Sequence, residues 1–112
     1  HLSLIDEEVD RNLTEILAIT TSNPLPQLLV GDFNASPSTK HIQRFSKHFH
    51  NAFGAGPYPD TYKKQGDHGK KIDYILQSNH FESLEAWTIQ SEASDHVPIV
   101  AKIRNLQNYN IF

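Results

Sequence analysis

The sequence predicts a layered α/β fold. Amphipathic helical stretches alternate with short apolar, strand-like runs in the first half of the chain, and only strand-like runs follow. The predicted order is strand, helix, strand, helix, strand, strand, strand. So few helices cannot cover such a sheet completely, so one face or edge is expected to lie open to a partner. With 112 residues the chain has room for one domain with a modest core.

The first helix is predicted by an apolar stripe at helical spacing. Residues 1–4 have the character of a strand end, and the stripe that follows consists of Ile5, Val9, Leu13, Ile16 and Leu17. Acidic side chains occupy the first turn, where the helix dipole favours negative charge. Residues 23–26 contain two prolines, which are expected to end the helix.

A buried strand and a second helix are expected next. Residues 27–30 include a continuous apolar run, which is typical of a strand covered on both faces. Ser36 is the expected N-cap of the helix, with Pro37 at the first helical position. The apolar stripe of this helix is Ile42, Phe45 and Phe49, and the helix is expected to end near residues 50–51.

The second half of the chain combines an irregular segment with strands. Residues 51–71 show no periodicity and contain most of the glycines together with Lys63, Lys64, Lys70 and Lys71. A long irregular stretch in a compact domain is typical of a functional loop or of disorder. Strands are expected at residues 72–76, 84–89 and 97–103, with residues 104–112 as a frayed tail.

Composition excludes several classes of protein. The chain has no cysteine, which excludes disulfides and zinc–thiolate sites. The formal net charge of −3 gives no overall basic surface of the kind that nucleic-acid-binding proteins usually present. No apolar stretch approaches the roughly 20 residues of a membrane span, so no transmembrane segment is expected. The absence of methionine predicts that the sequence begins inside a longer protein.

The candidate catalytic residues lie at three points of the sequence where a carboxylate stands beside an apolar run. These are Gly31-Asp32-Phe33-Asn34, Ile72-Asp73-Tyr74-Ile75 and Ser94-Asp95-His96. A polar residue at a strand end can point into a cleft that it shares with its neighbours. Carboxylates that converge there repel one another unless a cation or a proton lies between them. The three motifs together therefore predict a hydrolytic site that binds a hard metal ion.

Each of these residue types suits one part of such chemistry. Asp32 can activate a water, and Asn34 can donate a hydrogen bond to an oxyanion from the same face of an extended segment. His96 can serve as a base, an acid or a cationic donor to phosphate, with Asp73 as the candidate that orients its ring. Lysines in the 51–71 segment suit phosphate oxygens as mobile point charges.

Structural interpretations remain open beside the functional ones. Gly-Asp-x-Asn is also good turn chemistry, and strand alternation could aim Asp73 at solvent. Asp95 and His96 could form a surface pair, and the lysines could serve only to solvate a loop. The remaining internal histidines follow no metal-ligand spacing; they are His41, His48, His50, His68 and His80.

Taken together, the three motifs resemble the endonuclease/exonuclease/phosphatase superfamily, which includes DNase I-like nucleases, inositol polyphosphate phosphatases and neutral sphingomyelinases. Motif order, flanking apolar residues and spacing all fit, over nearly the whole chain. The resemblance implies half of a four-layer α/β sandwich with a mixed β-sheet and flanking helices. Residues 1–112 would be the C-terminal portion of one domain, and the N-terminal half would lie outside this chain. Members of the superfamily use Mg²⁺ or Mn²⁺ to hydrolyse phosphoester bonds.

The resemblance also implies a role for each motif residue near the metal. Asp32 would orient or deprotonate the attacking water, and Asn34 would hold the phosphate and the nucleophile. Asp95 would lie beside the metal, to which Asp32 and Asn34 would also contribute. The principal metal-binding glutamate and an early asparagine of the superfamily belong to the N-terminal half.

Further implied roles concern the phosphate itself. Asp73 would orient His96, which donates to a non-bridging phosphate oxygen. His1 would match a second active-site histidine of the nuclease, phosphatase and sphingomyelinase branches. The candidates for contacts to the substrate phosphate are Lys63, Lys64 and Lys70.

The expected function is therefore metal-dependent hydrolysis of phosphodiester or phosphomonoester bonds by in-line attack of water. Without the main metal-binding glutamate, the chain by itself is expected to be inactive. Nucleic acid, inositol phosphate and phospholipid head groups all remain open as substrates.

The alternative is a non-catalytic module, or an inactive fragment, that binds phosphorylated ligands through residues 63–71. Hydrolysis would require metal and Asp32, whereas binding through the lysines would require neither. A further alternative is a purely structural domain in which the motifs coincide by chance.

Overall fold

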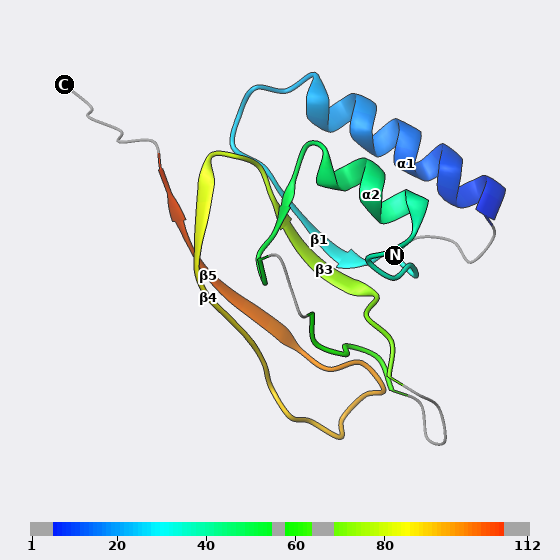
Figure 1. Cartoon of the computed structure of the whole chain (residues 1–112), viewed down its shortest axis with the longest axis vertical. Coiled ribbons are helices and arrows are strands. Elements are labelled where there is room, and N and C mark those ends of the chain that lie inside the picture. Colours follow the sequence, from blue (N-terminus) through cyan, green and yellow to red (C-terminus); the bar gives the residue numbers. More distant parts are fainter. Residues whose placement is uncertain (1–5, 55–57, 64–68, 107–112) are drawn as a thin grey trace.

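The computed structural model describes residues 6–54, 58–63 and 69–106. In chain order the elements are α1 (Asp6–Thr21), β1 (Leu28–Asp32), α2 (Lys40–Ser46), β2 (His50–Asn51), β3 (Asp73–Gln77), β4 (Phe81–Thr88) and β5 (Ile99–Asn105). Strands β1, β3 and β2 form one sheet in that order, and β4 pairs with β5 in a second (Figure 1). The predicted α/β class is confirmed.

Strand directions differ from the mixed sheet that the family resemblance implies. All pairings of the named strands are antiparallel in the described part of the chain. Strands β1 and β2 run in the same direction, but β3 lies between them and runs the opposite way. Strands β1 and β2, which α2 connects, are therefore parallel in direction but do not pair with each other.

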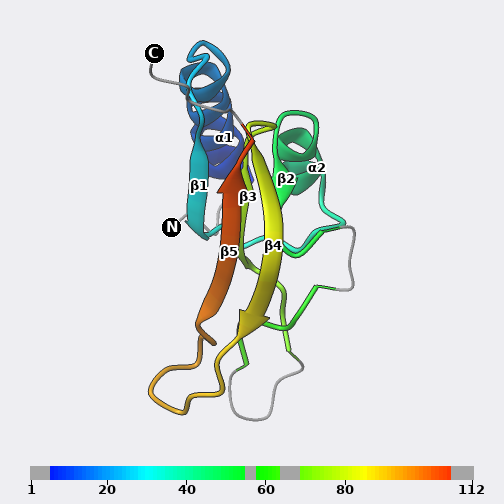
Figure 2. The same ribbon diagram turned by 90° about the vertical axis from the view of Figure 1, so that its left-hand side faces the viewer.

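Both helices lie on one side of the β1–β3–β2 sheet, and the β4–β5 ribbon lies on the other (Figures 1 and 2). The stripe predicted for the first helix is confirmed within α1, where Val9 and Leu13 are buried and Ile16 and Leu17 pack against the core. Ile5 and the strand expected at residues 1–4 lie outside the described residues. None of the helices in the described ranges is long and apolar enough to span a membrane.

Aromatic side chains form the centre of the core between the helices and the sheet. Phe33 follows β1 and packs against Phe45 of α2 and Tyr74 of β3, with ring centroids 5.2 Å apart in both pairs. Phe49 is buried beside Phe45. The apolar stripe predicted for the second helix therefore faces the core as expected, and it anchors the segment that follows β1.

The start of α2 differs from the prediction. Thr39, and not Ser36, is the N-cap, and its hydroxyl accepts a hydrogen bond from the backbone N–H of Ile42. Ser36 and Pro37 instead belong to a preceding turn, closed by a hydrogen bond from the Thr39 N–H to the Ser36 carbonyl. The helix also ends earlier than predicted, at Ser46, because His50 and Asn51 pair with β3.

One face of β1 is open, which corrects the expectation of a strand covered on both sides. Leu29 packs against the core, whereas Leu28 and Val30 are 45% and 66% exposed. The helices cover only the face of β1 that carries Leu29. The continuous apolar run predicts burial on both faces, but the helices do not bury the face that carries Leu28 and Val30. The separate expectation of an uncovered face or edge is met at β1, where Leu28 and Val30 are exposed.

The ribbon is longer than the sequence pattern indicates. Strand β4 begins at Phe81, before the expected start at residue 84, and β5 begins at Ile99, directly after Pro98. Residues 104–105, expected to fray, continue β5 because they pair with Glu82 and Phe81 of β4. An ion pair between Arg104 and Glu82 supports this end of the ribbon. Residues 107–112 of the predicted tail lie outside the described residues.

Candidate active site

The register of β1 and β3 brings two of the predicted carboxylates together. Asp32 is the last residue of β1 and Asp73 is the first residue of β3, and the two lie directly opposite each other. Tyr74 points into the core, so strand alternation places Asp73 on the opposite face, with Asp32 beside it. The site therefore lies at one end of the sheet face that the helices leave open.

Asp32 and Asn34 form a turn rather than an extended segment. The backbone N–H of Asn34 donates to Asp32 Oδ1 at 2.8 Å, and Asn34 has a φ of 49°. Gly31, with a φ of +154°, supplies a backbone conformation that side chains rarely adopt just before this turn. The expectation that both side chains share the face of an extended strand is therefore wrong, and the turn interpretation is correct. Asp32 is nevertheless part of the carboxylate cluster.

His96 completes the cluster from the segment before β5. Its Nδ1 lies 2.8 Å from Asp73 Oδ2, and its Nε2 lies 3.7 Å from Asp32 Oδ2. The side chains of Asp32 and Asp73 are 11% and 16% exposed, and that of His96 is 35% exposed. Because an ionised carboxylate only accepts hydrogen bonds, Nδ1 carries a proton and donates a hydrogen bond to Asp73 Oδ2. This leaves Nε2 facing Asp32 and the open side of the site.

The cluster favours the protonated form of His96. The hydrogen bond to Asp73 raises the pKa of His96 above its ordinary value, and the charges of Asp73, Asp32 and Asp95 act in the same direction, while burial opposes them. Two carboxylates at directly opposed strand positions repel each other, and an imidazolium between them relieves that repulsion. An imidazolium with Nδ1 bound to Asp73 has its Nε2–H available as a donor.

We expect the substitution Asp73→Asn to lower the pKa of His96. Asn preserves the shape of the acceptor but removes its charge, so the pKa moves toward the ordinary value of 6.5. In the wild type, the raised pKa stabilises the fold most fully below about pH 6.5, and this contribution disappears as the pH rises through the folded pKa. The measurement is an NMR titration of the His96 ring protons in both proteins. An unchanged midpoint would contradict this account of the raised pKa.

The other predicted site residues lie around the cluster or outside the described chain. Asp95 is exposed and accepts a hydrogen bond from Ser94 at 3.4 Å, and it acts on His96 through its charge rather than as a member of the cluster. The backbone N–H of Lys63 donates to the Asp95 carbonyl, and Lys63 itself is exposed. His1 and Lys64 lie outside the described residues.

Thr61 and Tyr62 contact the site, although no sequence pattern singled them out. The Thr61 hydroxyl accepts hydrogen bonds from the backbone N–H groups of Ile72 and Asp73. The Tyr62 ring packs edge-on against His96. Both residues belong to the irregular 51–71 segment, in which the sequence indicated only lysines as candidate site residues. A Thr-Tyr pair has no periodicity or motif that would have identified them.

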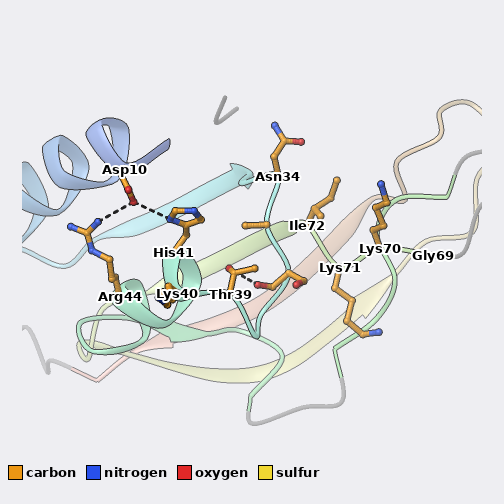
Figure 3. A pocket seen from close by; sticks show the side chains of 12 residues that line it. Asp10, Asn34, Thr39, Lys40, His41, Arg44, Gly69, Lys70, Lys71 and Ile72 are labelled. Carbon is orange, nitrogen blue, oxygen red and sulfur yellow. Dashed lines mark hydrogen bonds and ion pairs between the residues drawn. The ribbon is translucent and has the colours of Figure 1, made fainter. Parts of the chain in front are cut away.

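A cleft of about 930 Å³ opens beside Asn34, between α2 and residues 69–72 (Figure 3). On the helix side, Asp10 pairs with His41 at 3.3 Å and with Arg44 at 3.8 Å, which joins α1 to α2. On the other side, Lys70 projects in the same direction as Asn34 in Figure 3, whereas Lys71 points away and pairs with Asp60. Of the two lysines on this wall, Lys70 is therefore the one whose side chain extends on the same side as Asn34 (Figure 3).

The donor set suits a hard divalent cation. Asp32, Asp73 and His96 each offer a ligand atom, and these atoms lie within 4.8 Å of one another. Asp73 Oδ2 and His96 Nδ1 already bind each other, so a cation bound to both would have to replace that hydrogen bond. Mg²⁺ and Mn²⁺ prefer oxygen ligands, which the Asp32 and Asp73 carboxylates of this group provide. Further ligands would have to come from outside the cluster.

Comparison with known proteins finds a matching family model and similar solved structures. The family model described as Endonuclease/Exonuclease/phosphatase family matches residues 1–96. No curated protein matches the chain in sequence. Solved structures do match, and the chain spans less than half of each one described below.

Three of the similar structures, each from a different organism, are as follows. A functionally unknown conserved protein from Enterococcus faecalis V583 has a TM-score of 0.75 and 24% identity over 94% of this chain and 48% of that one. The human Nocturnin catalytic domain, with bound sulfate, has a TM-score of 0.63 and 21% identity over 88% and 40%. A Bacteroides thetaiotaomicron mannosyl-6-phosphatase has a TM-score of 0.55 and 18% identity over 88% and 45%. At these identities the likeness establishes the fold alone.

Proposed function

This chain belongs to the endonuclease/exonuclease/phosphatase family, and on that premise we propose that it is the C-terminal portion of a metal-dependent phosphoesterase domain. The observation that carries the proposal is the cluster itself. His96 is held by Asp73 through Nδ1 and faces Asp32 through Nε2, at the open end of the sheet. This geometry supports Asp32 as a general base and His96 as a cationic donor in the hydrolysis of an anionic ester.

In the proposed reaction the attacking water loses its proton to the Asp32 carboxylate. The new oxygen–phosphorus bond forms as the bond to the leaving oxygen breaks on the opposite side, and the leaving oxygen takes up a proton from solvent. Protonated His96 donates its Nε2–H to a non-bridging phosphate oxygen, where negative charge must be stabilised, and Asp73 keeps the ring in that orientation. Asn34 holds the phosphate through its side-chain amide.

Asp32 and Asn34 are the residues of this chain that would hold Mg²⁺ or Mn²⁺, with Asp95 beside them. A bound divalent ion would polarise the phosphoryl oxygen and stabilise the leaving group. The coverage of the similar structures, between 40% and 48% of their length, supports a domain that extends beyond these 112 residues. We propose that the remaining portion supplies the principal metal-binding glutamate.

The test is hydrolysis by the intact protein with and without metal. We expect a phosphodiester and a phosphomonoester of p-nitrophenol to distinguish the two bond types. Activity should disappear after treatment with EDTA and return with Mg²⁺ or Mn²⁺, because the proposed reaction requires the ion. Binding of phosphate esters without turnover, and without a metal requirement, would instead identify a non-catalytic module.

Lysines of residues 63–70 are proposed to attract the substrate phosphate. The Lys70 ammonium lies 5.7 Å from the centre of the Tyr62 ring, and that ring centre lies 5.0 Å from the His96 ring centre. Lys63 follows Tyr62 directly, and Lys64 comes next in the sequence. An exposed cation beside the cluster would raise the local concentration of an anionic substrate.

We expect the triple Ala variant at Lys63, Lys64 and Lys70 to raise KM more than it lowers kcat. The effect should shrink with added salt, since exposed charges are screened beyond about 10 Å at 0.1 M ionic strength. Lys102→Ala, on the exposed face of β5, is the matched control and should leave KM unchanged. A triple variant with wild-type KM at low salt would assign these lysines to loop solvation.

A further inference from the structure

We propose that Thr61 and Tyr62 are positioning residues, which hold Asp73 and His96 in the arrangement that hydrolysis requires. This inference rests on the proposed function of the site. It concerns two residues outside the named strands, in a segment of the chain with no regular structure. Neither residue needs to contact the substrate in this role.

Thr61 fixes the backbone at the start of β3. Its side chain is almost fully buried, and its residue exposure is 2%. The hydroxyl oxygen accepts from the Ile72 N–H at 3.2 Å and from the Asp73 N–H at 3.0 Å. On its other side, the Ile72 carbonyl accepts from the Phe33 N–H at 2.8 Å, one residue after Asp32. The Thr61 hydroxyl therefore determines how Asp73 sits relative to the end of β1.

The backbone of residues 61–63 also holds the His96 segment. The Val97 N–H donates to the Thr61 carbonyl at 2.7 Å, and the Lys63 N–H donates to the Asp95 carbonyl at 2.8 Å. These two bonds flank His96 on both sides. Thr61 thus joins the Asp73 strand to the His96 segment, with its hydroxyl on one and its carbonyl on the other.

Tyr62 supports the imidazole ring itself. Its ring meets His96 edge-on, with a centroid distance of 5.0 Å and an interplanar angle of 63°. Asp73 orients the imidazole from the Nδ1 side, and the ring can still tilt while it keeps that one hydrogen bond. The Tyr62 contact restricts this rotation from the side, so Nε2 stays directed at the open end of the cluster.

The role is separable from ordinary core packing. Tyr62 is not a member of the buried aromatic core that contains Phe33, Phe45 and Tyr74, and it remains partly exposed. Its backbone pairs with Lys70 and with His96 rather than extending a longer strand. Loss of its ring should therefore disturb His96 far more than it disturbs the helices.

The test uses two matched pairs of variants in the intact protein. Thr61→Val removes the hydroxyl at nearly constant shape, and Thr61→Ser restores it. Tyr62→Ala removes the ring, and Tyr62→Phe restores it. Thr39→Val removes the N-cap of α2 and controls for a loss of stability elsewhere. The two measurements are steady-state hydrolysis of a p-nitrophenyl phosphodiester and the NMR signal of the His96 Nδ1–H proton, assigned with His96→Gln.

We expect Thr61→Val and Tyr62→Ala to lower kcat about 10- to 100-fold with little change in KM, because displacements near 1 Å have costs of this size. Both should broaden or shift the Nδ1–H signal, whereas Thr61→Ser, Tyr62→Phe and Thr39→Val should preserve it. If Thr61→Val does not fold, the Tyr62 pair decides. An unchanged signal and unchanged kcat in folded Tyr62→Ala would overturn the proposal. Loss of the signal in a protein whose wild type hydrolyses no phosphoester would refute the proposed function and support the positioning role.

Discussion

Replacing Asp32 by Asn is expected to reduce phosphoester hydrolysis by about 10²- to 10⁴-fold, the usual cost of losing a general base. The Asn side chain can still accept the hydrogen bond that Asp32 Oδ1 receives from the Asn34 N–H, so the turn after β1 should survive. What disappears is the charge that accepts the water proton and attracts the metal. The measurement is kcat for a p-nitrophenyl phosphodiester at saturating Mg²⁺, with circular dichroism to verify folding.

Asp60→Asn provides the control for this substitution. Asp60 is an exposed aspartate whose carboxylate pairs with Lys71 at 3.0 Å, outside the three-residue cluster. Removing that charge should leave kcat within about twofold of the wild type, since exposed ion pairs contribute little. A folded Asp32→Asn protein that turns over substrate as fast as Asp60→Asn would refute the role of Asp32 as the base.

The sequence indicates the site well because its residues lie at strand ends. Apolar runs beside Asp32 and Asp73 predict strands, and strand ends meet when two strands pair. Strand alternation left the direction of Asp73 undecided, and Tyr74 resolves it, since its burial turns Asp73 to the opposite face. The partnership of Asp73 with His96 was expected from residue chemistry and is a hydrogen bond in the structure.

Features that depend on long-range contacts could not be predicted in the same way. The Thr61 hydroxyl binds backbone groups 11 and 12 residues away, and no local pattern encodes those contacts. The N-cap of α2 is Thr39 and not the predicted Ser36, because Ser36 belongs to the turn that precedes the helix. Whether a face of β1 is buried depends on which elements pack against it. The apolar run predicts only that the residues favour burial, and so it could not predict the open face.

The Asp73–His96 pair is expected to behave as one unit in mutant kinetics. Asp73→Ala removes the only hydrogen bond that the structure gives His96 Nδ1 in the described residues, and His96→Ala removes the donor to phosphate. Each single change should therefore lower kcat by about 10²-fold or more. After either change the other residue has little left to contribute, so the double variant should lie within about threefold of the poorer single variant.

A comparison of pairs gives this prediction its control. His96→Ala combined with Asp60→Asn joins two residues outside contact, and their effects on log kcat should simply add. Additive losses in the Asp73→Ala/His96→Ala variant would mean that Asp73 acts on the reaction independently of the imidazole, for instance through the metal. The 2.8 Å contact argues for the coupled outcome, because an aspartate that binds Nδ1 directs both the proton and the plane of the ring. The size of the coupling energy thus measures how far Asp73 works through His96.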